Sequence, residues 1–317
     1  PLPMSALLTL SSPVTHVSPV SHVSLLPMLA LSAPLPMSAL LPLSALLPMS
    51  ALSAMLALSA MLGYLANISK IKIMEAEMAE PKPLEKIEYW TSVWEEFEGN
   101  PPWHKSFIQP CLEQHYQKLI PTHEQASKVR IFQPLCGKSL DMLWLAEKGF
   151  QVVGLEAVET VIQDFFKENN VAFEVKTIPS SPHIKYYSSL DQSKDIIVYN
   201  MDVFDVSVDK LGGQFDAIWD RGSLSAIGLY TDNRGRRYAD ILRGLLRPHG
   251  RIMIENHIWL EDPGPHRGPP SHVPAEVLSD LFGGTFDITP LEVDKSVIVD
   301  TKPFNRVYNL MSLKFKN

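Results

Sequence analysis

Cysteine is scarce in this chain of 317 residues, which contains only Cys111 and Cys136. Two thiols are too few for a disulfide scaffold, so the sequence suits a reducing compartment, and we expect the cytoplasm. The histidines His257, His266 and His272 are scattered among loop prolines. Because no group of histidine, cysteine and aspartate has the spacing of metal ligands, we expect no metal site.

Runs of lysine and arginine are also missing. The formal net charge is -7 and the sequence pI is about 5.8. A general nucleic-acid-binding protein usually carries a basic stripe, because it must neutralise phosphates. The composition therefore excludes nucleic acid as an expected partner and is typical of an ordinary enzyme.

Formal charge is absent from residues 1–69, since the first charged side chain is that of Lys70. This segment repeats Pro-Met-Ser-Ala-Leu-Leu, a low-complexity pattern without the varied side chains of a packed core. We expect residues 1–70 to be a disordered or mis-annotated extension, and a start at Met74 or Met78 would suit the chain. Residues 51–68 are apolar and free of proline, so a membrane anchor is the alternative, although a secretory signal would need a basic start.

Residues 80–317 alternate strand-like apolar runs with helical patterns. The expected strands are 129–135, 151–156, 173–178, 196–200, 215–219 and 251–255, and the expected helices include 139–148, 162–169, 238–245 and a segment from Pro274. Two further strand-like runs, 292–299 and 307–315, follow without a helix between them. The sequence therefore predicts one α/β domain of Rossmann-like class, with a mostly parallel sheet, helices on both faces and an antiparallel C-terminal edge.

Ligands of such sheets bind at the carboxyl ends of the strands. The turn after the first strand, Pro134–Ser139, has Phe132 where a phosphate-binding P-loop needs glycine. A dinucleotide fingerprint needs three glycines, and only Gly137 is present. Glu156 ends the second strand nineteen residues after Gly137, where an acid accepts hydrogen bonds from ribose hydroxyls. A solvated acid is the structural alternative, but the combination favours a nucleoside without a diphosphate, such as S-adenosylmethionine.

Charged residues follow two other strands. Asp202 could accept a hydrogen bond from an adenine amino group, or it could simply cap a turn. Asp220 and Arg221 end the strand 215–219, where a buried pair must either pair together or contact a ligand; a structural ion pair is the alternative. Trp90 and Trp94 share one helical face and precede Trp103. Such a face is more often core, yet aromatic rings also attract a desolvated sulfonium.

These motifs occur in a recognisable order: Trp-x-x-x-Trp, Pro-Leu-Cys-Gly-Lys, Val-Val-Gly-x-Glu, Ile-Trp-Asp-Arg-Gly and Gly-Pro-Pro-x-x-Val-Pro. From about residue 84 to the C-terminus, the chain resembles the thiopurine S-methyltransferase family, a class I S-adenosylmethionine-dependent group. The resemblance implies a cofactor site at Trp90, Trp94, Trp103, Leu135, Glu156, Asp202, Val203 and Arg221, to which the Gly137 turn is added. It also implies that Trp103 borders the acceptor and that Arg221 lies beside the reacting thiol.

The sequence departs from the family in three places. Trp103 stands where mammalian members have phenylalanine, and Asp202 replaces a smaller residue. Between Asp294 and Asn305 we find no counterpart of the basic residue that the family places near its substrate.

The resemblance implies methyl transfer from S-adenosylmethionine to a small aromatic or heterocyclic thiol. Arg221 is the expected catalytic residue and would favour the thiolate, so no general base is required. The chain is expected to act as a monomer on a small-molecule thiol. Another acceptor, such as a halide, an inorganic thiol or a metalloid, remains an alternative, as does a non-catalytic binding protein.

Overall fold

The structure is a computed structural model that describes residues 87–121, 128–261, 269–299 and 302–314. Contacts divide the chain into Pro1–Ile73 and Met74–Asn317, and every described residue lies in the second unit. The predicted extension and the apolar run 51–68 lie outside the described residues. Within the described part, no helix is long and apolar enough to cross a bilayer.

One sheet of nine strands organises the second unit, in the order β3-β4-β5-β2-β1-β6-β7-β9-β8. The strands are β1 Arg130–Gln133, β2 Gln151–Glu156, β3 Phe173–Ile178, β4 Ser181–Ser189, β5 Ile196–Asn200, β6 Phe215–Arg221, β7 Leu246–Trp259, β8 Phe286–Val299 and β9 Lys302–Leu313. The helices are α3 Ile87–Glu96, α4 Pro110–Leu119, α5 Asp141–Glu147, α6 Glu159–Glu168, α7 Ser223–Ala226, α8 Arg234–Leu245 and α9 Ala275–Phe282, with a 3-10 turn η1 at Val203–Asp205.

The five central strands β5, β2, β1, β6 and β7 are parallel. The C-terminal strands β9 and β8 are antiparallel, as the sequence predicts. The sequence did not predict β4, because its polar and serine-rich residues show no regular apolar alternation. β4 pairs antiparallel with both β3 and β5, so the sheet has a second antiparallel edge.

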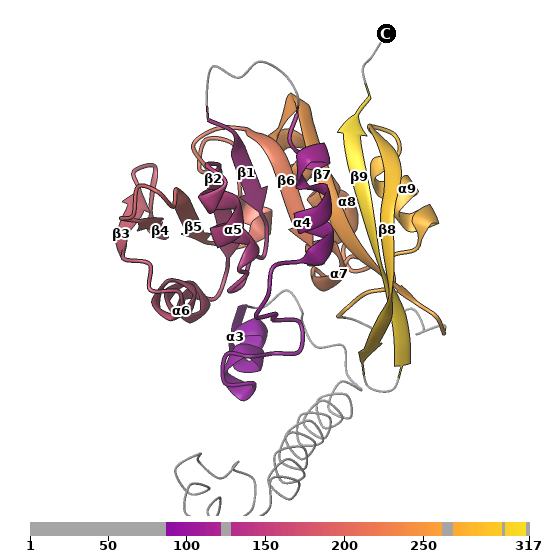
Figure 1. The fold of residues 1–317 in the computed structure, drawn as a ribbon, viewed down its shortest axis with the longest axis horizontal. Helices are drawn as coiled ribbons and strands as arrows, with labels where there is room; N and C mark the ends of the chain where they lie inside the picture. The colour runs from indigo at the N-terminus through magenta and orange to yellow at the C-terminus, as the bar shows by residue number, and fades with distance from the viewer. Residues whose placement is uncertain (1–86, 122–127, 262–268, 300–301, 315–317) are drawn as a thin grey trace, which may run out of the picture. The chain divides into compact units, whose positions relative to one another are not determined.

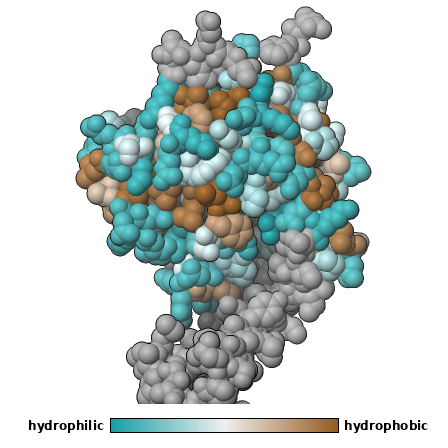
Figure 2. Space-filling view, viewed as in Figure 1, coloured by the Kyte–Doolittle hydropathy of each residue, from teal (hydrophilic) through white to brown (hydrophobic). Residues whose placement is uncertain are grey.

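Alternation along the central strands builds two cores, one on each face of the sheet. Ile131 and Val152 pack with α4, α5 and α6, whereas Phe132 and Val153 face the side of α8 and α9. Figure 1 shows α4 and α5 in front of the sheet and α8 behind it. The front face presents mostly hydrophilic residues with smaller hydrophobic patches between them (Figure 2). Because helices cover both faces, the central strands are almost continuously apolar.

The strand order reverses at β1, which lies between β2 and β6. The chain leaves β1 for α5 on one face of the sheet and leaves β6 for α7 and α8 on the other, so the loops that follow β1 and β6 diverge at the point where such sheets bind their ligands. The helix α3 lies beyond the carboxyl ends of these strands (Figure 1). The topology thus places the turn 134–139, the end of β6 and α3 together.

Candidate active site

Glu156, the last residue of β2, is held by the turn that follows β1. One carboxylate oxygen accepts a hydrogen bond from the backbone N–H of Gly137 at 3.1 Å, and the other accepts one from the N–H of Val158 at 2.9 Å. Burial raises the pKa of Glu156, while the amides of Val158 and Gly137 act in the opposite direction. Each oxygen keeps a further lone pair, so the carboxylate is fixed in place and can still accept from a ribose.

The turn itself has unusual backbone geometry. Leu135 has a φ of 43° and Gly137 a φ of 51°. A non-glycine residue in this region costs roughly 1–3 kcal/mol and is found at ligand sites when the surroundings enforce it. A Cβ on Gly137 would lie 3.2 Å from the Trp94 ring. The turn therefore needs glycine both for its conformation and for the close approach of α3.

Three tryptophans form an aromatic group above this turn. Trp94 is buried and packs on Val158 and Val161, with Trp90 against the same cluster. The Trp103 ring meets Trp90 edge-on at 5.9 Å between ring centroids and Trp94 at 6.3 Å. Trp103 is 42% exposed, so it lies at the outer side of the group. Trp94 is thus part of the core, whereas Trp103 faces solvent.

Asp202 and Val203 follow β5, which is the neighbour of β2, and Glu156 pairs in register with Asn200. The Asp202 side chain accepts a hydrogen bond from the Phe204 N–H at 2.8 Å and begins η1. This is the turn-capping role that the sequence left open for Asp202. Val203 is buried. Both residues therefore lie at the same sheet edge as Glu156.

Asp220 and Arg221 do not form the pair that their adjacency suggested. Successive side chains of a strand point to opposite faces. The fully buried Asp220 accepts hydrogen bonds from the Ser223 N–H and the Tyr238 hydroxyl, and burial raises its pKa to about 6. Arg221 instead donates to the backbone oxygen of Trp103 at 3.0 Å. The structure therefore places Asp220 in the core and Arg221 at the aromatic group.

Two further basic residues, which the sequence interpretation missed, lie near Arg221. Burial lowers the pKa of Lys105, and the charges of Arg306 and Arg221 lower it further. Arg306 lies one residue beyond the segment in which we sought a basic residue, and pairs with Asp294 at 3.6 Å. Its position on β9 opposite His257 supplies the signal, but only once the strand register is known.

A buried polar network lies beneath these cations. The Gln109 amide donates to Glu255 at 2.8 Å and to the Tyr308 hydroxyl at 2.9 Å. His257 contacts both Glu255 and the Ser225 hydroxyl, and burial lowers its pKa to about 4. The imidazole is therefore neutral at pH 7. These residues were not identified in the sequence, because their chemistry depends on contacts between segments up to 199 positions apart.

The lysine of the Gly137-Lys138-Ser139 triplet has a structural role. Its ammonium contacts the Glu168 carboxylate at 2.6 Å, and the Lys138 side chain is almost fully buried. A Cβ on Gly99 would lie 3.3 Å from this ammonium. Lys138 thus links the turn to α6 beneath the loop that follows α3, in keeping with the absence of a P-loop pattern.

Comparisons with known proteins show which family the chain resembles. A protein-family model described as thiopurine S-methyltransferase matches residues 85–311. The thiopurine S-methyltransferase of Bos taurus is 35% identical over 208 residues, covering 65% of this chain and 79% of its own. That of Mus musculus is 36% identical over 190 residues, covering 60% and 76%.

The chain belongs to the thiopurine S-methyltransferase family. It is accordingly an S-adenosylmethionine-dependent methyltransferase. Its sheet order agrees with this, since a parallel sheet ending in an antiparallel strand next to β7 is the predicted fold. Among solved structures, the 1,6-didemethyltoxoflavin-N1-methyltransferase of Burkholderia thailandensis is 16% identical, with a TM-score of 0.48 over 75% of this chain and 92% of its own.

The residues present fit a sulfonium nucleoside. Glu156 supplies a fixed carboxylate, the Gly137 turn leaves no room for a side chain, and Trp94 closes the turn from above. No diphosphate-binding glycine pattern is present in the turn, in agreement with a cofactor that lacks phosphate.

Proposed function

We propose that this enzyme methylates the sulfur of a small aromatic or heterocyclic thiol, with Arg221 at the reacting centre. The observation that carries the proposal is the hydrogen bond from Arg221 to the Trp103 backbone, which fixes a guanidinium between the aromatic group and the end of β6. Family membership supports sulfur as the acceptor atom, since the curated relatives are thiopurine S-methyltransferases.

The cofactor residues of the proposal are those at the strand ends. Glu156 would accept from the ribose hydroxyls, with Leu135 and Gly137 shaping the turn beside it. Asp202 and Val203 would border the adenine, and Trp90 and Trp94 would cover the sulfonium. S-adenosylmethionine supplies an electrophilic methyl group when bound.

On the acceptor side, Arg221 and Trp103 are the proposed substrate contacts. A thiolate is the nucleophilic form of sulfur, and aromatic thiols ionise close to neutral pH. Positive charge from Arg221, reinforced by Lys105 and Arg306, would favour the thiolate before transfer. Placement of the sulfur in line with the methyl group would supply the rest, within about 3–3.5 Å at attack. The proposal assigns no general base.

We also propose that the enzyme is a monomer in the cytoplasm. Cys111 and Cys136 are free and buried thiols, which suits a reducing compartment.

A methyl-transfer assay with labelled S-adenosylmethionine tests the function. We expect label in 6-mercaptopurine, with kcat/KM well above the values for iodide and bisulfide. A preference for iodide or bisulfide would replace the thiol proposal by one for a different nucleophile. Tight cofactor binding by calorimetry, without label in any acceptor, would make the chain a binding protein and refute the proposal.

A further inference from the structure

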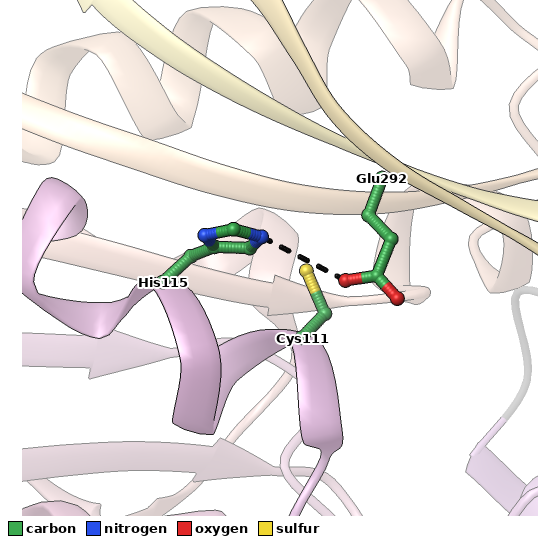
Figure 3. A group of neighbouring side chains, drawn as sticks. All are labelled: Cys111, His115 and Glu292. Carbon is green, nitrogen blue, oxygen red and sulfur yellow. Dashed lines mark ion pairs between the residues drawn. The ribbon is translucent and has the colours of Figure 1, made fainter.

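Three side chains with metal-ligating atoms that the proposed methyl transfer does not use converge on the front face of the sheet. Cys111 and His115 are four residues apart on α4 and therefore share one helix face. Glu292 approaches them from β8 (Figure 3). Their sulfur, nitrogen and oxygen atoms all lie within 4.8 Å of one another, and His115 Nε2 is 3.7 Å from Glu292 Oε2.

Local structure explains why Glu292 faces the helix. The pairing of β8 with β9 shifts register between Pro290 and Glu292, and Glu292 then lies opposite Tyr308. A β-bulge of this kind re-aims the side chain that follows it. Pro110 begins α4 at its first turn, where proline is favoured. Both the helix face and the strand face are therefore fixed by backbone features.

One oxygen of the three residues has no hydrogen-bond donor among the described residues. Glu292 Oε2 is buried and accepts no hydrogen bond among the described residues, and 3.7 Å to His115 is too long for one. The side chain of His115 is 11% exposed and that of Glu292 is 39% exposed, so it is the Oε2 atom that is buried and not the whole Glu292 side chain. A buried carboxylate oxygen without a donor costs free energy. A cation bound between the oxygen, the nitrogen and the sulfur would remove this cost.

The same three residue types also make up nucleophilic triads, but two observations oppose that interpretation here. A triad needs the histidine between the nucleophile and the acid, whereas these atoms form a triangle. Burial and the Glu292 carboxylate raise the pKa of the Cys111 thiol to about 12. A reactive cysteine needs a lowered pKa, whereas a metal ion displaces the thiol proton directly.

In contrast to the expectation from sequence spacing, we propose that Cys111, His115 and Glu292 bind one divalent transition-metal ion with the ligand preference of Zn²⁺. One sulfur, one imidazole nitrogen and one carboxylate oxygen form a mixed set that zinc accepts. With bond lengths of about 2.0–2.3 Å, tetrahedral ligands lie about 3.3–3.6 Å apart, so the three atoms need move by only a few tenths of an ångström to about an ångström. On binding, the Cys111 thiol releases its proton to solvent and the thiolate coordinates the ion.

The fourth coordination position faces a pocket. Cys111, Glu292, Tyr308 and Lys295 line this open space of about 570 Å³, which can supply a water ligand. The site joins α4 to the C-terminal hairpin, and Gln109 just before α4 donates to Tyr308 and Glu255. We therefore assign the ion a structural role: it would link α4 to β8 and stabilise their packing. This assignment does not depend on which acceptor the enzyme methylates.

Cobalt titration of the tag-free, reduced full-length protein tests the site. We expect one equivalent of Co²⁺ to bind. The complex should show a thiolate-to-cobalt charge-transfer band in the near ultraviolet, and d–d bands in the visible that are as intense as those of tetrahedral cobalt. Cys111→Ser should abolish the thiolate band, and His115→Gln and Glu292→Gln should each weaken binding at least tenfold. Zn²⁺ should displace the cobalt and raise the Tm of the wild type.

Matched controls separate this site from general loss of structure. Cys136→Ser removes the other thiol, His183→Gln removes an exposed histidine, and Glu113→Gln alters the exposed face of α4. Each should retain stoichiometric cobalt binding, with circular dichroism confirming the fold of all six variants. No saturable binding in the wild type, or an unchanged thiolate band in Cys111→Ser, would overturn the proposal. If Cys111→Ser fails to fold, wild-type affinity in both His115→Gln and Glu292→Gln would overturn it equally.

Discussion

At the residue scale, two adjacent charged residues at the end of β6 have different roles. The fully buried Asp220 is one position from Arg221, yet strand alternation gives the two side chains separate roles. One carboxylate is fixed in the core by Ser223 and Tyr238, and one guanidinium is presented to the aromatic group. Their effects on stability and on activity should therefore be separable by substitution.

Replacement of Arg221 should impair catalysis in a pH-dependent way. We expect Arg221→Ala to lower kcat/KM for 6-mercaptopurine by about 10- to 100-fold at pH 7, or about 1.4–2.7 kcal/mol. The deficit should shrink at higher pH, because the thiolate then forms without electrostatic help. Arg221→Lys should recover part of the loss. The control Arg243→Ala breaks an exposed ion pair with Asp240 on α8 and should leave the pH–rate profile unchanged.

Glu156 should determine cofactor affinity. In Glu156→Gln, an amide NH₂ must face the N–H of either Gly137 or Val158, which removes an acceptor and disturbs the turn. We expect the Kd for S-adenosylhomocysteine to rise at least tenfold in calorimetry. The exposed Glu147→Gln on α5 is the control. An unchanged Kd would remove Glu156 from the nucleoside site.

Asp220 should make the enzyme less stable as pH rises. Its folded-state pKa is raised from 3.8 to about 6, so its contribution is fully present below pH 3.8 and is lost as the pH rises through about 6. The loss amounts to about 3 kcal/mol at most. In Asp220→Asn, the amide accepts from Ser223 and donates to the Tyr238 hydroxyl, which can reverse its role.

Urea denaturation at pH 4 to 8 measures this effect. The free energy of unfolding of Asp220→Asn minus that of the wild type should grow as the pH rises and level off above about pH 7. The difference between the two proteins cancels the opposite trend from His257, whose pKa of about 4 destabilises the fold as the pH falls below 6.5. A difference that is flat across this range would contradict the assignment.

At the scale of elements, β2 and the turn after β1 fit together through a glycine. A Cβ on Gly154 would lie 2.8 Å from both Cys136 Sγ and Met142 Sδ. We expect Gly154→Ala to lower the free energy of unfolding by about 1–3 kcal/mol through overpacking. The control is Gly244→Ala in α8, where a Cβ meets nothing within 4 Å and should stabilise by about 0.5–1 kcal/mol. Chemical denaturation of both variants measures the contrast.

Apolar periodicity predicted most of the helices and strands, but not all of them. The helix of Trp90 and Trp94, the strands 151–156 and 196–200 and the helix after Pro274 are all present. These segments have strong apolar patterns of period 3.6 or 2. The strand β4 was missed because its mostly polar residues, few of which are buried, give no clear apolar alternation, although it lies between β3 and β5. Its pairing with β5 is set by the hairpin from β3 and not by its own composition.

At the scale of the whole molecule, the described residues build a hydrophobic core on each face of the sheet, and the family match begins at residue 85. We therefore predict that residues 74–317 fold and methylate without the preceding segment. The Tm and kcat/KM of this shortened chain should equal those of the full-length protein. A lower Tm, with the same purity and cofactor content, would show that residues 1–73 contribute to the fold.

The sequence by itself determined the fold class and the strand ends, and it predicted Glu156, Gly137 and Arg221 as site residues. It could do so because strand periodicity and turn chemistry are local, and parallel strands bring their carboxyl ends to one edge. Only the tertiary structure separated Asp220 from Arg221, brought Lys105 and Arg306 together, and placed Glu292 beside Cys111 and His115. These relations depend on strand register and on a bulge in β8, which are set by packing between distant segments.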